Sequence, residues 1–290
     1  MFDVNTIIHY PQGRLGNLLF QLVAASEVIG ARNRVVTLAS EATDYFNWDD
    51  SFFILPCPRC IRARVTLVWM YILRLISQIG IIGIIQPDQL DLPNGFTSEG
   101  IGVKINQGFF SNVYVLVGFF QHECFRKVKP ETIKSLKSDA EFRLKNIPLE
   151  FRVAVHFRFG DYENFSIYGA KGTEIPLHYY IKAFNLIEKK IQMPEYIIFS
   201  DNPQKAKLVM NQTGRFFTIY DGNEPIHDFV GMSSCSHAVL SASTFAWWAA
   251  DLIQNPNKII IAPEFWLGFK TNSWFPTHIK TKGFTYISAL

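Results

Sequence analysis

Few cysteines and few charged residues are the first features of this sequence. Four cysteines in 290 residues are too few for a disulfide scaffold, and no Cys/His group has the doubled spacing of a structural zinc site. Charged residues make up 18% of the chain and the formal net charge is +3, an excess too small to predict a surface for nucleic acid or for an anionic membrane. Hydrophobic residues make up 48%, which excludes a disordered, collagen-like or coiled-coil chain. A chain of this length is expected to form two packed lobes.

Several nucleotide-binding motifs are also absent. The sequence has no G-x-x-x-x-G-K-[ST], so a P-loop kinase or sulfotransferase lacks its main signature. No two aspartates are spaced as D-x-D, which removes the usual metal clamp for a sugar nucleotide. The Gly-rich turn Gly13-Arg14-Leu15-Gly16-Asn17 is not G-x-G-x-x-G, and no acidic residue follows about 20 positions later at a strand end. These absences argue against a bound metal and weaken a dinucleotide-binding interpretation.

The most hydrophobic stretch, residues 65–85, approaches the length of a membrane span but contains Arg74, Ser77, Gln78 and two glycines. Because an arginine in mid-span costs about 2.5 to 3.5 kcal/mol, we interpret the stretch as a buried helix followed by a β-branched strand at residues 81–85, ended by Pro87. A membrane span is the alternative. Residues 1–10 contain no apolar h-region, so no signal peptide or anchor is expected there.

Two short motifs have both a structural and a chemical interpretation. Cys57-Pro58-Arg59-Cys60 is a C-x-x-C that could be redox-active or close as a local disulfide, but it lacks the βαβ context of a thioredoxin motif. We therefore expect a loop pair without chemistry. Asn164-Phe165-Ser166 and Asn211-Gln212-Thr213 are glycosylation sequons, which matter only if the chain is lumenal.

The first part of the chain mixes regular and irregular segments. A strand at residues 6–10 precedes the Gly-rich turn, and apolar residues at helical spacing follow from Leu18 to Ile29. Residues 34–38 predict the next strand, and the chain up to about Asn112 is expected to be irregular because prolines punctuate it. A strand at residues 114–120 and an exposed charged helix at residues 126–145 lead to a domain boundary near Pro148.

From Arg152 onward, strands and helices alternate regularly. Strands are predicted at residues 153–157, 196–199, 215–220, 238–240 and 258–261, separated by helices at 177–191, from 203, through 229 and 232, and at 244–252. This alternation predicts an α/β fold with a parallel sheet and helices on both faces. In such sheets ligands bind beyond the carboxyl ends of the strands, so the candidate residues are those that follow strands.

One such segment is H-x-R-x-G-D, formed by His156, Arg158, Gly160 and Asp161 at the end of the strand at 153–157. The guanidinium of Arg158 could clamp a diphosphate bidentately, which a lysine ammonium cannot do. The alternative is an Arg158/Asp161 pair that only fixes a loop.

A second segment, Ser241-Ala242-Ser243-Thr244-Phe245, follows the strand at 238–240 and opens a helix. Its hydroxyls and free N–H groups could bind an anion with the help of the helix dipole. The alternative is a helix N-cap alone, a role in which serine and threonine are common.

Seven segments together carry a family resemblance. They are Gly13-Arg14-Leu15-Gly16-Asn17 with Phe20-Gln21, Gly118-Phe119-Phe120-Gln121, His156-Phe157-Arg158-Phe159-Gly160-Asp161-Tyr162, Phe199-Ser200-Asp201, Asp228-Phe229 through Met232-Ser233, Ser243-Thr244-Phe245-Ala246-Trp247-Trp248-Ala249, and Asn255-Pro256 with Ala262-Pro263. In this order they resemble the motifs of the α-1,2-fucosyltransferase family, glycosyltransferase family 11. Residues 47–112 match nothing in that pattern.

The resemblance implies a fold and a reaction. The fold would be GT-B-like, with two facing Rossmann-type lobes: residues 1–148 on the acceptor side and residues 149–290 binding the donor. The donor would be GDP-β-L-fucose, transferred with inversion to a galactoside hydroxyl in α-1,2 linkage, without a metal, a resident cofactor or nucleic acid. The acceptor would be a galactose-terminated glycan selected by residues 47–112. The location would be the membrane-associated Golgi lumen for a eukaryotic chain, or the bacterial cytoplasm.

The resemblance also implies roles for single residues. Arg158, assisted by Arg14 across the cleft and by N–H groups, would neutralise the leaving GDP, and Asp161 or His156 would be the base. Asn17 would either contact substrate or cap the helix that starts at Leu18. Phe157, Phe159, Phe245 or Trp248 would form an apolar wall for the C6 methyl group of fucose. The expected donor-binding residues are Arg14, Gly16, Asn17, Ser200, Asp201, Asp228, Ser241, Ser243, Thr244 and Phe245.

Two other functions fit the same residues. A nucleotide-dependent dehydrogenase is favoured by the βα alternation and the first Gly-rich turn, and it would bind NAD rather than GDP. A catalytically inactive protein that binds a sugar nucleotide would share the fold, although an intact H-x-R-x-G-D argues against lost activity.

Overall fold

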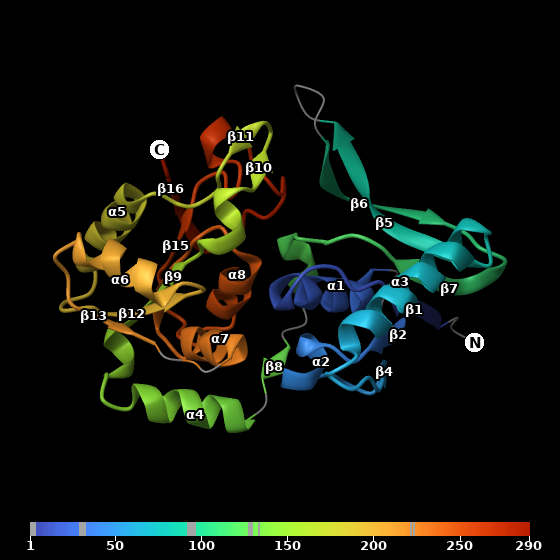
Figure 1. Cartoon of the computed structure of the whole chain (residues 1–290), viewed down its shortest axis with the longest axis horizontal. Helices are drawn as coiled ribbons and strands as arrows, with labels where there is room; N and C mark the ends of the chain where they lie inside the picture. Colours follow the sequence, from blue (N-terminus) through green and yellow to red (C-terminus); the bar gives the residue numbers. More distant parts are fainter. Residues whose placement is uncertain are drawn as a thin grey trace. The chain divides into compact units, whose positions relative to one another are not determined.

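The computed structural model describes residues 4–28, 33–91, 97–126, 130–132, 134–220, 222 and 224–290. The chain divides into two compact units, Met1–Ile133 and Lys134–Leu290 (Figure 1). The division comes before α4 (Lys134–Leu144), earlier than the boundary expected near Pro148. Helix α4 belongs to the C-terminal unit because the Arg152 guanidinium donates to the Leu144 carbonyl oxygen at 2.9 Å and to a Glu141 carboxylate oxygen at 2.9 Å.

The N-terminal unit is built on a six-stranded sheet in the order β4-β2-β1-β7-β5-β6. All neighbouring strands are parallel except β5 and β6. The strands are β1 (Asn5–His9), β2 (Asn33–Leu38), β4 (Phe52–Leu55), β5 (Ile82–Asp91), β6 (Thr97–Asn106) and β7 (Phe110–Leu116). The other elements are α1 (Leu15–Glu27), α2 (Glu41–Tyr45), α3 (Arg62–Gln78), a 3-10 helix at Glu123–Arg126, and β3 (Phe46–Asn47) paired with β8 (Glu131–Thr132).

The segment expected to be irregular is mostly ordered structure. Strands β4, β5 and β6 all join the sheet, and β5 continues past Pro87, where we expected it to end. The pairing of β5 with β6 shifts register between Pro87 and Gln89, and such an irregularity accommodates a residue that has no N–H to donate. The helix and the strand predicted within residues 65–85 are confirmed as α3 and the start of β5. The expected burial of the helix is wrong, because Leu73 is buried but Leu67 and Tyr71 are exposed. Among the described residues, none of the helices is both long and apolar enough to cross a bilayer.

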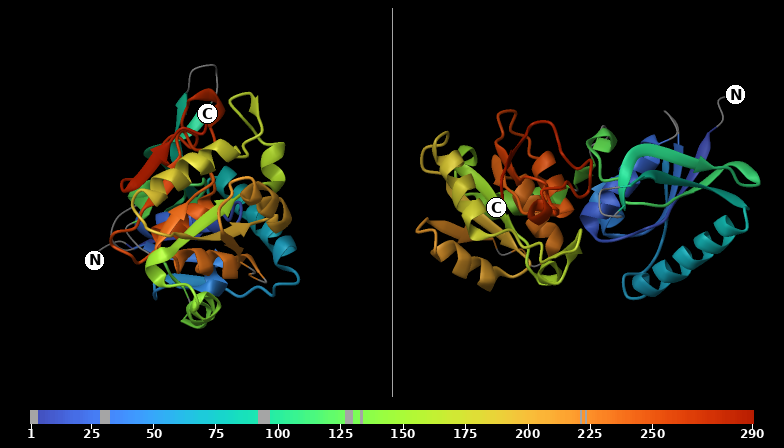
Figure 2. Two further views of the ribbon diagram at one scale, coloured as in Figure 1. Left: turned by 90° about the vertical axis from the view of Figure 1, so that its left-hand side faces the viewer. Right: turned by 90° about the horizontal axis from the view of Figure 1, so that it is seen from above.

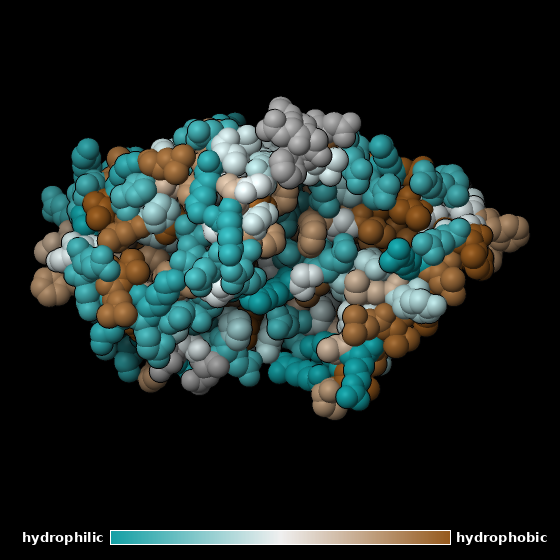
Figure 3. Space-filling view, turned by 45° about the horizontal axis from the view of Figure 1, so that its top comes forward, coloured by the Kyte–Doolittle hydropathy of each residue, from teal (hydrophilic) through white to brown (hydrophobic). Residues whose placement is uncertain are grey.

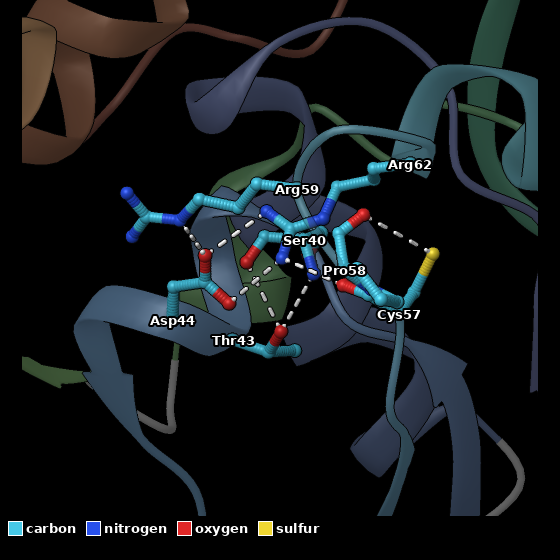
Figure 4. Close-up of polar contacts among 7 residues, drawn as sticks. All are labelled: Ser40, Thr43, Asp44, Cys57, Pro58, Arg59 and Arg62. Atoms are coloured by element: carbon cyan, nitrogen blue, oxygen red, sulfur yellow. Dashed lines mark hydrogen bonds and ion pairs between the residues drawn. The ribbon is translucent and has the colours of Figure 1, made fainter.

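The C-x-x-C segment forms the turn that leads into α3 (Figure 4). Cys57 is buried, Cys60 is exposed, and both are free thiols, so the loop interpretation is confirmed and the local disulfide is wrong. The neighbouring arginines fix the turn instead. Asp44 of α2 accepts from Arg59 Nε at 3.1 Å and from Arg62 Nη1 at 2.9 Å.

The C-terminal unit contains a second six-stranded sheet, ordered β13-β12-β9-β14-β15-β16 and parallel throughout. Helices cover both of its faces (Figure 2). The strands are β9 (Arg152–Phe157), β12 (Glu195–Ser200), β13 (Phe217–Ile219), β14 (His237–Val239), β15 (Ile260–Pro263) and β16 (Phe284–Ile287). The helices after α4 are α5 (Leu177–Glu188), α6 (Pro203–Asn211), α7 (Pro225–Ser233) and α8 (Thr244–Asp251), and a hairpin joins β10 (Ser166–Ile167) to β11 (Ala170–Lys171).

This strand order is that of a doubly wound α/β sheet. The chain runs outward from β9 to β13 on one side and from β14 to β16 on the other, so the order reverses between β9 and β14. Every residue of β9 is buried, as expected for a central parallel strand. The crevice beside such a reversal is where these sheets bind ligands. The predicted α/β alternation is therefore confirmed, and the strand ends at β9, β12 and β14 define the place to look for a site.

Candidate active site

Arg158 lies just beyond the end of β9, between two carboxylates. Its Nη2 donates to Asp161 Oδ1 at 2.6 Å, and its Nη1 lies 3.2 Å from Asp201 Oδ2 at the end of β12. The Arg158 side chain is only 16% exposed, whereas that of Asp161 is 56% exposed. The guanidinium also lies 5.4 Å from the ring centre of Tyr162. The structure thus holds one cation firmly at the carboxyl ends of two neighbouring strands.

The turn after β9 is folded around Asp201. Asp201 Oδ1 accepts a hydrogen bond from the Phe159 backbone N–H at 2.9 Å. Gly160 has φ +41°, and a Cβ there would lie 2.9 Å from Asp201 Oδ2, so a side chain would be both strained and crowded. The sequence predicted Arg158 and Asp201 as separate candidates, and the structure brings them together.

His156 is buried behind this turn. Its Nδ1 lies 2.8 Å from Ser241 Oγ, and this contact spans β9 and the segment after β14, where the strand order reverses. Burial, assisted by the charge of Arg158, lowers the pKa of His156 to about 3. With this pKa, His156 is neutral near pH 7. A base works best when its pKa lies near the working pH, so His156 is poorly suited to accept the proton. Of the two candidate bases, the exposed Asp161 is the better placed.

The segment 241–245 opens α8 but is not an ordinary cap. Ser243 occupies the N-cap position, yet its side chain makes no capping hydrogen bond. Ser241 and Ser243 are buried, and the Ala242 carbonyl accepts from the Tyr162 hydroxyl at 2.8 Å. Phe245 lies 5.8 Å from the His156 ring, centre to centre. The Ser243 hydroxyl therefore does not cap the helix, and the anion site at this segment stays a prediction.

Two other predicted donor contacts lie beside the starts of helices. The Ser200 hydroxyl accepts from the Asn202 backbone N–H at 3.0 Å at the start of α6. Asp228 lies in the first turn of α7, beside Gly222. Of the proposed aromatic wall, Phe157, Phe159 and Trp248 are buried in the core.

The Gly-rich turn of the N-terminal unit starts α1 three residues earlier than expected. The helix begins at Leu15, with the exposed Arg14 as its N-cap residue. Asn17 therefore lies inside the first turn, and its role as an N-cap is wrong. Asn17 Oδ1 accepts from Gln121 Nε2 at 2.9 Å. Gly13 has φ +82°, and a Cβ there would lie 2.3 Å from Asn17 Nδ2, so glycine makes room for the amide.

Two polar residues that position this turn were not among the predicted site residues. Gln121 belongs to the quoted G-F-F-Q motif, which could have identified it. Glu99, on β6, had no signal because it lies in the segment without motifs. Its two carboxylate oxygens accept from the backbone N–H groups of Phe119 at 2.8 Å and Phe120 at 2.9 Å. Burial raises the pKa of Glu99. Glu99 therefore fixes the backbone at Phe119 and Phe120, next to Gln121, which contacts Asn17.

His9, the last residue of β1, is linked to the start of the same turn through hydrogen bonds of Gln21. Its Nδ1 lies 2.9 Å from Thr37 Oγ1, and its Nε2 lies 2.8 Å from Gln21 Oε1. Gln21 in turn bonds the backbone N–H and carbonyl of Gln12 at 3.1 and 2.8 Å. Burial lowers the pKa of His9 to about 4. The Phe20-Gln21 part of the motif therefore serves the scaffold.

The charges at this site suit an anionic ligand. Within the described parts of the chain, no group of three or more His, Cys, Asp or Glu side chains could hold a metal ion. The fixed charge that a ligand would meet at the end of β9 is the Arg158 guanidinium. The first-turn N–H groups of α8 follow the neighbouring strand β14, and such groups favour anions.

Comparison with known proteins points to one family. The model of glycosyl transferase family 11 matches residues 107–288, which include both segments that meet at the strand reversal. The alpha-1,2-colitosyltransferase of Escherichia coli is 25% identical over 278 residues, covering 88% of this chain and 90% of that protein. The galactoside alpha-(1,2)-fucosyltransferase 2 of Rattus norvegicus is 25% identical over 144 residues, covering 44% of this chain and 40% of that protein.

Solved structures extend the comparison to the fold. The structure of POFUT1 in complex with GDP-fucose superposes with a TM-score of 0.52 at 10% identity, covering 89% of this chain and 98% of that chain. The E. coli ADP-heptose heptosyltransferase II gives a TM-score of 0.51 at 8% identity, covering 98% and 90%. At these identities the likeness concerns the fold alone. The two α/β units form a GT-B-like fold, and the chain belongs to glycosyl transferase family 11.

Proposed function

We propose that this glycosyltransferase moves L-fucose from GDP-β-L-fucose to a hydroxyl of a galactoside, with inversion and in α-1,2 linkage. The observation that carries the proposal is the Arg158 guanidinium, held by Asp161 and Asp201 where a doubly wound sheet binds its ligand. A named relative of the same family, the rat enzyme, is a galactoside fucosyltransferase.

The leaving GDP requires positive charge. Arg158 would bind the diphosphate as a planar two-donor clamp, and the N–H groups at Ser243 and Thr244 would add the dipole of α8. Donors fixed before the reaction cost no reorganisation when charge develops, and each typically contributes about 3 to 4 kcal/mol to transition-state stabilisation. We propose that these groups replace a metal, so that catalysis needs none.

Arg158 already has two anionic partners, and the diphosphate has to displace one of them. Asp201 also accepts from the Phe159 backbone, so its carboxylate is needed to shape the turn. The Asp161 carboxylate meets Arg158 through one oxygen and is largely exposed. We propose that the diphosphate replaces Asp161, which then accepts the proton of the acceptor hydroxyl, while the neutral His156 keeps the turn in place.

The acceptor would bind in the N-terminal unit. A pocket of about 270 Å³ lies there beside α3, the ends of β1 and β7 and the first half of β5. Its polar lining includes Tyr10, Gln12, Arg74, Gln78 and Gln86, and its apolar lining includes Leu73 and Val117. Amide and hydroxyl groups beside apolar surface suit the hydroxyls and the C–H face of a sugar. Most of this lining falls within residues 47–112, where we expected acceptor selection.

Colitose is the second candidate sugar. The E. coli colitosyltransferase aligns with nearly the whole chain, and colitose is the 3-deoxy analogue of L-fucose. A site that hydrogen-bonds the 3-hydroxyl of fucose would reject colitose strongly, whereas an apolar site would discriminate weakly.

The test combines binding and transfer. Thermal shifts with GDP, UDP and NAD come first, since a ligand at 100 times its Kd stabilises by about 2.7 kcal/mol. Transfer from GDP-fucose and GDP-colitose to lactose is then followed by product analysis, with and without excess EDTA. Selective stabilisation by GDP and EDTA-resistant fucosyl transfer support the proposal. Stabilisation by NAD would favour a dehydrogenase, and GDP binding without any transfer would favour an inactive binding protein.

The compartment stays a prediction. Two of the relatives found are from E. coli, which agrees with the bacterial alternative rather than with the Golgi. We therefore favour a bacterial setting, and the sequons at Asn164 and Asn211 would then carry no glycan.

A further inference from the structure

Helix α3 has two apolar faces, and only one of them is covered within its unit. The inner face packs on the sheet: Leu73 is buried against Ile82 and Val115, with Trp69 and Ile76 beside them. Figure 2 shows α3 at the outside of the N-terminal unit, with the sheet on one side of it. A surface helix normally turns polar residues toward solvent. The side of α3 opposite the sheet instead turns apolar residues toward solvent.

We call the outer face of α3 the five exposed apolar residues Leu67, Val68, Tyr71, Ile72 and Leu75 of the helix together with Ile79, which directly follows it. Leu67 is 67% and Tyr71 is 68% exposed. The patch continues past the end of the helix, because Phe109 N–H donates to the Gly80 carbonyl at 2.8 Å and Phe110 N–H to the Ile81 carbonyl at 3.1 Å. Both phenylalanines are exposed. Figure 3 shows hydrophobic residues gathered over this end of the unit.

The charge around the outer face is positive. Residues 51–87 contain four arginines and no aspartate, glutamate or lysine. Arg59 and Arg62 are bound to Asp44 and anchor the start of the helix (Figure 4). Arg64 is exposed on α3 itself, whereas Arg74, also exposed, lines the pocket proposed for the acceptor. The net charge of +3 for the whole chain therefore conceals a locally cationic, apolar surface.

The arrangement suits a lipid surface better than a second helix. A seam for one helix needs apolar residues at two positions per heptad, but the outer face has them at 67, 68, 71, 72, 75 and 79, which makes a wider band. Helices that lie in a membrane interface combine such a band with arginines that reach the headgroups. Exposed aromatic side chains are favoured at the same depth. We propose that the outer face of α3, with Phe109 and Phe110, binds the surface of an anionic lipid bilayer without crossing it.

The experiment measures binding of the full-length protein to vesicles. Wild-type protein is co-sedimented with vesicles of phosphatidylcholine alone and with vesicles that also contain phosphatidylglycerol. Binding should be stronger to the anionic vesicles and should fall several-fold in high salt, because the Debye length shrinks from about 10 Å at 0.1 M to about 3 Å at 1 M. Equal or absent binding to both vesicle types would overturn the proposal.

Two variants with a matched control separate this surface from general stickiness. L67S/Y71S should lower the partition coefficient at least about tenfold, because apolar burial drives interfacial binding. L208S/F216S removes two apolar side chains of the C-terminal unit that are 66% and 95% exposed, and it should bind like the wild type. R64E should weaken binding to anionic vesicles only.

Sedimentation velocity without lipid tests whether a second copy of the chain, instead of a lipid surface, covers the outer face of α3. A monomer in both wild type and L67S/Y71S agrees with the proposal. A dimer that L67S/Y71S dissociates would assign the outer face to a second copy of the chain and overturn the lipid assignment. Transfer to a short soluble acceptor should stay unchanged in L67S/Y71S, which confirms that the variant is folded. This outcome is independent of which sugar the enzyme transfers.

Discussion

The two units use the same scaffold for two different turns. In each, the central strand β1 or β9 carries a buried histidine at or next to its end, and a turn with a positive-φ glycine follows. The turns differ in what fixes them. Arg158 in the C-terminal unit is held by the carboxylates of Asp161 and Asp201, whereas Arg14 is exposed and the neighbouring turn is fixed by an amide pair.

This difference suggests a division of labour. A guanidinium held between carboxylates offers a fixed positive charge, which suits a diphosphate. The Asn17–Gln121 pair offers neutral donors and acceptors, which suit a sugar hydroxyl. The comparison therefore predicts that charge substitutions are most harmful in the C-terminal unit, and that amide substitutions matter most in the N-terminal unit.

The largest expected effect is at Arg158. Arg158→Lys should lower kcat/KM almost as much as Arg158→Ala, by about a hundredfold or more, because an ammonium cannot reproduce a planar two-donor contact. Steady-state kinetics with GDP-fucose, together with the melting temperature, measure the loss. The matched control is Arg14→Lys, which keeps a charge at the exposed arginine and should lose less.

If Arg158→Lys retained most of the wild-type kcat/KM, the guanidinium of Arg158 would only fix the turn. In that case the charge contrast between the two units would have no functional meaning, and Asp201 would owe its position to the backbone of Phe159 alone.

Acid should destabilise both units through their buried histidines. Burial places the pKa of His156 at about 3 and that of His9 at about 4, below the unfolded value of 6.5. Below pH 6.5 the unfolded chain binds protons that the folded chain does not, so stability is present above that pH and is lost as pH falls. Well below pH 6.5 and above the folded pKa, the expected loss approaches about 1.4 kcal/mol per pH unit for each histidine.

Hydrogen exchange followed by mass spectrometry at several urea concentrations would report each unit separately. His156→Gln should flatten the pH dependence of the C-terminal unit only, and His9→Gln that of the N-terminal unit only. An unchanged slope in either variant would show that another group controls its acid sensitivity.

The sequence predicted the C-terminal unit far better than the N-terminal one, for physical reasons. Short apolar strands alternating with helices leave few alternatives, and in such a pattern the candidate residues are those that directly follow β9, β12 and β14. In the N-terminal unit, the strand predicted at residues 81–85 is the start of β5, but Pro87 argued against its continuation to Asp91. The start of α1 was misplaced because Asn17 is a good N-cap by type, whereas Arg14 is not. The role of Glu99 depends on a contact across 20 residues, which no local pattern reveals.

A smaller effect is expected at the amide pair. Asn17→Ser removes the acceptor of Gln121, and because Asn17 is not the N-cap, the change should not weaken the helix start. We expect kcat/KM to fall about tenfold, about 1.4 kcal/mol, at an unchanged melting temperature. Gln121→Ala should have a similar effect, and the double variant should be no worse than either single one, because contacting residues are not additive. Full additivity would mean that the two amides act separately.

The smallest expected effect is at Glu99, which positions the amide pair without belonging to it. In Glu99→Gln one of the two backbone N–H groups at Phe119 and Phe120 loses its acceptor and faces an N–H₂ group, at a cost of about 1 kcal/mol. Part of this cost is offset, because burial already disfavours the charge of Glu99 and raises its pKa.

Because the pKa of Glu99 is raised, the stability difference between wild type and Glu99→Gln should depend on pH. The folded chain binds a proton at Glu99 more readily than the unfolded chain, so this group favours folding at low pH, and its contribution is lost as pH rises through the folded pKa. The difference in melting temperature between wild type and Glu99→Gln should therefore change with pH. In Glu195→Gln, a control at an exposed glutamate, the difference should stay near zero.

Since Glu99 acts on substrate only through Gln121, Glu99→Gln should lower kcat/KM by less than Asn17→Ser does. A larger loss would mean that the Glu99 carboxylate itself meets the acceptor, and the N-terminal turn would then present a charge after all.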